Sequence, residues 1–229
     1  MPARIILIRA KNWLKVRLSR RSWPYMALRS IYRVTDLEQR WFRKRSIDSG
    51  RFETVGDLHM CSLLPKYTID RVLSLFAPRS WLDVGCGTGA ALAYVADKGI
   101  VAVGLEKSSV AIRHSRVRQR IIQHDLSVPL AMNRKFDVVW CYEVAEHLPP
   151  MSADQLVETL CRHGDIVVLS AAPPGQGGHG HVNEQPATYW IGRFETMGFR
   201  VDEGATAQLH AVDELFSSNI IAFVRRQNP

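Results

Sequence analysis

The sequence is poor in cysteine and has no long apolar run. None of its four cysteines has the close spacing of a redox or zinc-binding pair. No stretch approaches the roughly 20 apolar residues of a membrane span, and the short apolar run at residues 5–8 is followed at once by an arginine. These absences argue against a zinc module, a membrane span or a signal peptide. We expect a reduced, cytoplasmic protein in which Cys86 and Cys141 are small buried residues.

Acidic residues are scarce at the start of the chain. Residues 1–50 hold 13 lysines and arginines against three acids, whereas the other 179 residues hold 17 against 19. The segment therefore carries a net charge of +10 and the rest of the chain −2, so the overall charge of +8 comes from the segment. Arginines alternate there with large apolar and aromatic residues, which predicts a basic amphipathic helical extension over residues 1–60. Three roles stay open for it: packing on the rest of the chain, peripheral binding to an anionic membrane, or binding to RNA.

Repeats and low-complexity tracts are absent, and from residue 80 onward apolar runs alternate with helical patterns. This alternation predicts an α/β domain over residues 61–229, with a mostly parallel sheet and helices on both faces. The expected strands are 80–84, 101–106, 120–126, 136–143, 165–170, 199–202 and 219–224. The expected helices are 67–76, 90–96, 108–118, 152–161 and 185–197, and Ser108 and Ser152 are expected as N-caps.

The run Asp83-Val84-Gly85-Cys86-Gly87-Thr88-Gly89 has the narrowest chemical interpretation. Its glycines permit a sharp turn and a close approach to a ligand, and the following helix points N–H groups at that ligand. Asp83 would repel a pyrophosphate but attract an ammonium group. A nicotinamide-binding turn remains an alternative, because Gly85-x-Gly87-x-x-Ala90 fits its loose form, and so does a purely structural turn.

The Asp-x-Gly-x-Gly-x-Gly pattern resembles the first motif of class I S-adenosylmethionine (SAM) methyltransferases. The resemblance covers about residues 65–226 and implies a seven-stranded Rossmann-like sheet whose last strand is antiparallel. It implies that the turn binds the methionine end of SAM. Glu106, at the next strand end, can accept hydrogen bonds from ribose hydroxyls, and Asp125 would face the adenine unless it only caps a turn. The expected cofactor-binding residues are Asp83, Gly85, Cys86, Gly87, Gly89, Glu106, Asp125, Leu126 and Tyr142.

The segment Glu143-Val144-Ala145-Glu146-His147-Leu148 resembles the Glu-Val-x-Glu-His-Leu motif of small-molecule methyltransferases, including ubiquinone-pathway O-methyltransferases. The resemblance places it beside the reactive methyl group. A hydroxyl acceptor would need a base, for which His147 is the first candidate and Glu143 the next, with His181 as a further catalytic residue. His147 could instead only orient the loop.

Glu143, Glu146 and His147 also have the i, i+3, i+4 spacing that can share one face of a helical turn. With His181 they would supply two carboxylates and two imidazoles. This set resembles the Mg²⁺ or Mn²⁺ site of small-RNA 3′-terminal 2′-O-methyltransferases, and the basic N-terminal segment would suit RNA. The longer substrate-binding elements of those enzymes are not found in this sequence.

The polar, glycine-containing segment at residues 179–186 has the composition of a segment that covers a site. We expect His181 and Asn183 to face the methyl acceptor, and Tyr189 or Trp190 to pack against it. The alternative is a solvated loop with both aromatic residues in the core.

Together these features predict a SAM-dependent methyltransferase acting on oxygen of a small molecule, a glycan or a lipid-linked intermediate. The first alternative is metal-assisted 2′-O-methylation of an RNA 3′ terminus. The second is a non-catalytic SAM- or nucleotide-binding module with a membrane or scaffold role.

Overall fold

The fold is described for residues 62–227 of a computed structural model. The predicted basic extension over residues 1–60, and the membrane and RNA partners predicted for it, lie outside the described residues. None of the helices within 62–227 is long and apolar enough to cross a membrane.

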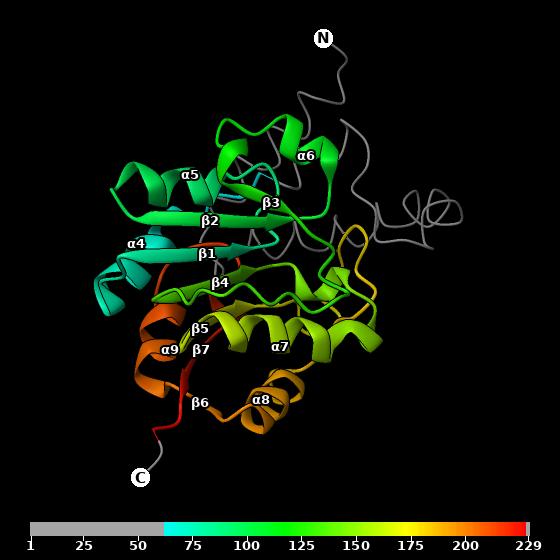
Figure 1. The fold of residues 1–229 in the computed structure, drawn as a ribbon. Helices are drawn as coiled ribbons and strands as arrows, with labels where there is room; N and C mark the ends of the chain where they lie inside the picture. The colour runs from blue at the N-terminus through cyan, green and yellow to red at the C-terminus, as the bar shows by residue number, and fades with distance from the viewer. Residues whose placement is uncertain (1–61, 228–229) are drawn as a thin grey trace, which may run out of the picture.

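Seven strands form one sheet in the order β3-β2-β1-β4-β5-β7-β6 (Figure 1). The strands are β1 (Ser80–Val84), β2 (Val101–Glu106), β3 (Ile121–Gln123), β4 (Val138–Tyr142), β5 (Ile166–Ser170), β6 (Phe199–Val201) and β7 (Ile220–Arg225). Strand β7 runs antiparallel to β5 and β6, and the other pairs are parallel. The predicted seven-stranded, mostly parallel Rossmann-like sheet is confirmed.

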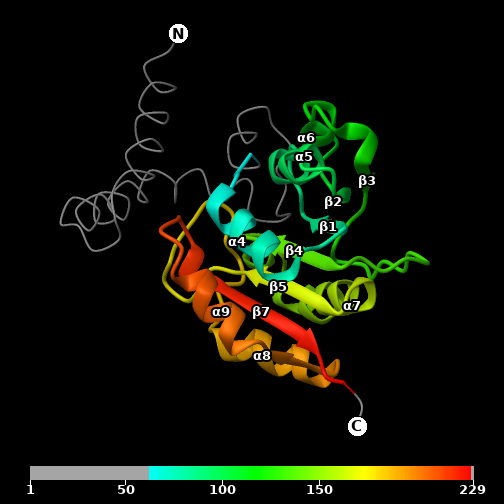
Figure 2. The same cartoon turned by 90° about the vertical axis from the view of Figure 1, so that its left-hand side faces the viewer.

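Helices cover both faces of the sheet because the strands are apolar on both sides. Helices α4 (Lys66–Phe76), α5 (Ala90–Asp97) and α9 (Glu203–His210) contribute to one core cluster, and α7 (Ala153–His163) and α8 (Ala187–Thr196) to the other. Figure 2 shows α4 and α9 side by side over one face. Neighbouring residues of β1 alternate between the clusters: Trp81 belongs to the first and Leu82 to the second. Cys86 and Cys141 are buried as predicted.

Three helix predictions need correction. The helix expected over 108–118 is the short α6 (Ser109–Arg113), followed by the 3₁₀ turn η2 (Arg118–Arg120), although Ser108 caps it through Ala111 N–H as predicted. Ser152 makes no capping bond, because it ends the 3₁₀ turn η4 (Pro150–Ser152) and lacks the extended backbone of an N-cap. Helix α9 was not predicted, although Asp202 caps it by accepting from Ala205 N–H.

Strand order reverses beside β1, which pairs with β2 on one side and β4 on the other. Ligands of open α/β sheets bind at such a reversal, outside the carboxyl ends of the strands. Asp83, in β1, pairs there with Gly104 of β2 and Trp140 of β4. The topology therefore brings the glycine turn, the end of β2 and the segment after β4 to one edge of the sheet.

Candidate active site

The glycine turn after β1 needs its glycines. Gly85, Gly87 and Gly89 have φ values of +77°, +55° and +75°, which favour glycine because it has no Cβ. A Cβ on Gly85 would also lie 2.5 Å from a methyl group of Val144. The Gly85 and Cys86 N–H groups both donate to the Leu105 carbonyl, at 2.8 and 3.0 Å. The turn is therefore held between the end of β2 and the segment that follows β4.

Asp83 lies at the base of this turn with only 3% of its surface exposed. One of its carboxylate oxygens has no hydrogen-bond partner in the described part of the chain. Burial first, and then the negative charge of Glu106, raise the pKa of Asp83 to about 7, although a bond from Leu92 N–H opposes this. A buried carboxylate of this kind is stabilised by a cationic ligand.

Glu106 ends β2 and is held by backbone donors. Its carboxylate accepts from Gly87 N–H at 2.9 Å and from Ser108 N–H at 2.6 Å. Burial raises the pKa of Glu106, and the backbone hydrogen bonds lower it only in part. The side chain is thus oriented before any ligand arrives.

These groups line one cavity with a volume of about 140 Å³. The predicted residues that line it are Asp83, Gly85, Cys86, Gly87, Glu106, Leu126, Tyr142, Glu143 and His147. Its wall also includes Leu63 and Pro65, which precede α4, and Trp140 from β4, none of which was predicted. Trp140 stacks on Tyr142 with ring centroids 5.0 Å apart. Most of the predicted cofactor side therefore converges on this cavity.

Asp125 does not line this cavity and is already engaged. It lies two residues beyond β3, where Lys107 Nζ is 2.6 Å away and the Ser127 N–H and hydroxyl donate to it. Burial raises the pKa of Asp125, but Lys107 and Ser127 outweigh it and lower the pKa to about 2. The contact of Asp125 with adenine stays a prediction. In the structure Asp125 caps a turn and is paired with Lys107. Gly89 also lies outside the lining.

Glu143 does not share a helical turn with Glu146 and His147, which corrects the four-residue arrangement. Its φ is +54°, and the 3₁₀ turn η3 covers only Ala145–His147. The Glu143 carboxylate accepts from Ser170 Oγ, from Gln176 Nε2 at 3.2 Å and from Asn219 Nδ2 at 3.2 Å. Gln176 and Asn219 were missed because no sequence motif marks them.

Glu146 is fully buried, and neither carboxylate oxygen has a hydrogen-bond partner of normal geometry among the described residues. Burial and the nearby charge of Glu143 raise its pKa well above the usual value. The Glu146 carbonyl accepts from Val182 N–H at 2.9 Å and Asn183 N–H at 3.0 Å. The polar loop after β5 is therefore docked on η3.

His147 and His181 meet beside Glu146. Their ring centroids are 4.9 Å apart, and one ligand atom from each of the three residues lies within 4.8 Å of the others. His147 Nδ1 donates to the Gly180 carbonyl at 3.2 Å. Burial, and after it the neighbouring His181 imidazole, lower the pKa of His147 to about 4, so the His147 ring is neutral at pH 7. His181 itself does not line the cavity.

Residues 60–203 match the family model of the methyltransferase domain. The chain belongs to this family. The aligned residues include the glycine turn, Glu106, the Glu143–His147 segment and the loop that carries His181.

Curated relatives of this methyltransferase domain are named ubiquinone biosynthesis O-methyltransferases. The protein of Vibrio vulnificus strain YJ016 is 28% identical over 149 residues, which is 61% of this chain and 60% of the relative. The protein of Nitrosomonas europaea is 29% identical over 122 residues, which is 49% of this chain and 52% of the relative. The chain thus spans about 60% of the length of the Vibrio relatives.

Solved structures confirm the fold of the methyltransferase domain. DesVI of Streptomyces venezuelae has a TM-score of 0.56 at 19% identity, covering 75% of this chain and 97% of that one. Magnesium protoporphyrin IX methyltransferase of Synechocystis PCC 6803, solved with bound SAH, has a TM-score of 0.56 at 18% identity, covering 86% and 99%.

The other residues predicted near the methyl acceptor do not line the cavity. Asn183 is buried and accepts from Gln185 Nε2 at 3.0 Å. Trp190 lies in the core, as the alternative prediction of a solvated loop with its aromatic residues in the core expected for this residue. Tyr189 packs under the Arg193 guanidinium, 3.6 Å from the ring centroid.

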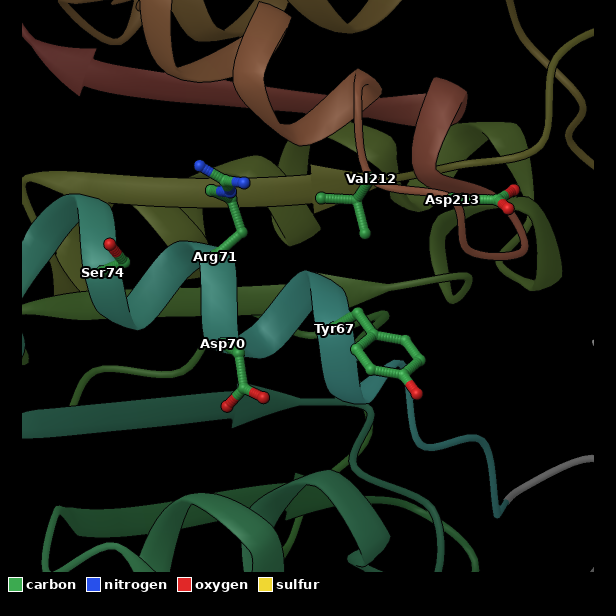
Figure 3. Close-up of a pocket in the computed structure, with 6 residues that line it drawn as sticks. All are labelled: Tyr67, Asp70, Arg71, Ser74, Val212 and Asp213. Carbon is green, nitrogen blue, oxygen red and sulfur yellow. The ribbon is translucent and has the colours of Figure 1, made fainter.

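A larger hollow of about 610 Å³ runs along α4 and the loop after α9 (Figure 3). It contains Asp70 and Arg71 of α4 together with Val212 and Asp213. Asp70 is already paired with Lys98 at 3.2 Å and with the Tyr94 hydroxyl at 2.8 Å. The hollow lacks the glycine turn and strand-end acids that converge on the smaller cavity, which is therefore the candidate active site.

Proposed function

We propose that this chain is a SAM-dependent methyltransferase. The observation that carries the proposal is buried Asp83 under the glycine turn, whose carboxylate has one oxygen without a hydrogen-bond partner among residues 62–227. The ammonium group of SAM's methionine part would supply the missing positive charge. Glu106 is placed at the end of the next strand to accept hydrogen bonds from the ribose. Membership in the methyltransferase-domain family supports this assignment.

On the acceptor side, we propose O-methylation of a small molecule, with glycans and lipid-linked intermediates as further acceptor classes. The names of the Vibrio relatives support oxygen as the acceptor atom. In the reaction, the acceptor oxygen bonds the methyl carbon as the carbon–sulfur bond breaks, and SAH leaves. His147 lines the cavity with its proton on Nδ1, so Nε2 carries the lone pair that accepts the hydroxyl proton.

Isothermal titration of the full chain tests the cofactor proposal. We expect one equivalent of SAM to bind and NAD to give no heat, because Asp83 would repel a pyrophosphate. Binding of NAD without SAM would reverse the assignment. Incubation with methyl-tritiated SAM and separated metabolite, lipid and RNA fractions then identifies the acceptor. We expect label in the metabolite fraction, whereas label in RNA alone would favour the RNA 3′-terminal alternative.

A second proposal is that Glu146, His147 and His181 hold a divalent cation. The donor set fits, because a fully buried carboxylate with no hydrogen-bond partner of normal geometry within residues 62–227 lies beside two imidazoles. Glu143 is not part of this set, because three other side chains hold its carboxylate. A bound cation would occupy the lone pair on His147 Nε2, so it would replace His147 in activating the acceptor hydroxyl, by polarising it.

Mn²⁺ binding measured by electron paramagnetic resonance tests this site. We expect one equivalent to bind the wild type, and Glu146→Gln to weaken binding at least ~10-fold because it removes the only charged ligand. Glu195→Gln, at an exposed position of α8, is the matched control and should bind as the wild type does. Equal Mn²⁺ binding by Glu146→Gln, or none by the wild type, would remove the metal from the proposal.

A further inference from the structure

The loop after β5 contains a carboxylate that no part of the proposed chemistry uses. The Glu184 side chain is 19% exposed and points back into its own loop. One carboxylate oxygen accepts from Gly177 N–H at 2.7 Å and pairs with His181 Nδ1 at 2.8 Å. The other accepts from Gly175 N–H at 2.8 Å. A single carboxylate thus ties three points of the loop together.

The glycines of the loop make this convergence feasible. Gly175 and Gly177 have φ values of +81° and +68°, which turn their N–H groups toward Glu184 without a Cβ penalty. Gly178 leaves room for the imidazole, because a Cβ there would lie 2.3 Å from His181 Nε2. The His181 ring is therefore held by Glu184 on one side and closely flanked by Gly178 at its tip.

The partner of Nδ1 decides the tautomer of His181. Carboxylate oxygens accept hydrogen bonds, so a neutral His181 ring in this contact has its proton on Nδ1 and its lone pair on Nε2. His147 has the same tautomer, because its Nδ1 donates to the Gly180 carbonyl. In general a hydrogen bond to one ring nitrogen of histidine sets which nitrogen can act as a base or a ligand.

We infer that Glu184 is a positioning residue that fixes both the orientation and the tautomer of His181. The effect reaches η3, because the same loop docks there through Val182 and Asn183 N–H on the Glu146 carbonyl. The consequence for catalysis rests on the proposed function, but the tautomer itself does not. Loss of Glu184 would release the His181 ring and loosen the loop that contacts His147.

Long-range proton–nitrogen correlation spectra of the ¹⁵N-labelled full chain at pH 8 report the tautomer directly. We expect the wild-type His181 to carry its proton on Nδ1. Glu184→Ala should shift His181 toward the Nε2–H form, whereas Glu184→Gln should keep Nδ1–H because its amide oxygen still accepts. Glu195→Ala, on the exposed face of α8, is the matched control and should leave the spectrum unchanged.

A wild-type His181 with its proton on Nε2, or a His181 signal unchanged in Glu184→Ala, would overturn the inference. If Glu184→Ala does not fold, Gly178→Ala addresses the same ring from its other side. Its Cβ should displace the ring and move the His181 signals. Gly192→Ala should not, because a Cβ there meets no side chain of the described residues within 4 Å. Unmoved signals in a folded Gly178→Ala would contradict the ring placement on which the inference depends.

Steady-state kinetics distinguish a positioning role of Glu184 from a purely structural one. With an identified acceptor, Glu184→Ala should lower kcat about 10-fold or more with KM for SAM unchanged, and Glu184→Gln should restore most of it. If SAM does not bind, the proposed function fails but the tautomer result stands. If SAM binds but the wild-type His181 carries its proton on Nε2, the proposed role of Glu184 is wrong and the proposed function is unaffected.

Discussion

Asp83→Asn should weaken SAM binding by about 100-fold while making the unliganded protein more stable at pH 8. Asparagine keeps the shape of the side chain but removes the charge that would pair with the ammonium group. Losing one partner of a buried charge pair costs on the order of 2–5 kcal/mol of binding free energy. Asp83 is 3% exposed, so solvent would not replace the lost interaction.

The stability gain follows from the sign of the pKa shift. The pKa of Asp83 is about 7 in the folded chain, against about 3.9 for an unfolded aspartate. Between these values the folded state binds more protons than the unfolded state, so stability falls as the pH rises from about 4 to about 7. Above pH 7 the folded state bears the full cost of burying the ionised Asp83 carboxylate. Asparagine would avoid this cost and raise the free energy of unfolding by up to about 4 kcal/mol.

Urea unfolding at pH 4 and pH 8, with SAM titrations at pH 8, measures both effects. The stability difference between Asp83→Asn and the wild type should be large at pH 8 and small at pH 4. Wild-type SAM affinity should also rise from pH 6 to pH 8 as Asp83 ionises. Asp97→Asn, at an exposed position on α5, is the matched control and should change neither quantity. A destabilised Asp83→Asn that still binds SAM tightly would contradict this account of the cavity.

Gly85→Ala should destabilise the fold far more than Gly99→Ala. Both glycines have positive φ, +77° and +83°, so alanine costs about 1 kcal/mol at either position. A Cβ at Gly99 meets no atom of the described part of the chain within 4 Å, whereas one at Gly85 lies 2.5 and 2.7 Å from the two methyl groups of Val144. Overpacking of this kind adds about 1–3 kcal/mol.

The Gly85 variant should also impair SAM binding, because Val144 lines the cavity and immediately precedes η3. Thermal unfolding and SAM titration of the two alanine variants make the comparison. The destabilisation of Gly99→Ala measures the cost of placing alanine in a positive-φ conformation. The additional destabilisation of Gly85→Ala measures the cost of the contact with Val144. Equal destabilisation by the two variants would show that the turn can move away from Val144 without cost.

The strands and the cofactor side of the cavity follow from short-range patterns. Most strands are short runs of mainly apolar residues, although β1 contains Asp83 and β6 contains Arg200. The glycine turn is itself a short contiguous sequence that ends at Gly89. Glu106 could be placed because it ends a strand that is parallel to β1. The boundaries of helices were less certain, since α6 and η4 depend on local hydrogen bonds that compete with a regular helix.

The acceptor side of the site depended on tertiary structure. Spacing alone grouped Glu143 with Glu146, but the positive φ of Glu143 and its bonds to Gln176 and Asn219 direct its carboxylate to other partners. The loop containing His181 is positioned by its own hydrogen bonds and by docking on η3.

By itself the sequence determined the fold class, the glycine turn and the acids near the ends of β1 and β2, because those signals lie within single elements. Only the tertiary structure decided that Leu63 reaches the cavity, that Glu143 stands apart from Glu146, and that Glu184 holds His181. The physical reason is that a side chain's partners across loops depend on backbone turns and packing, which residue spacing does not encode.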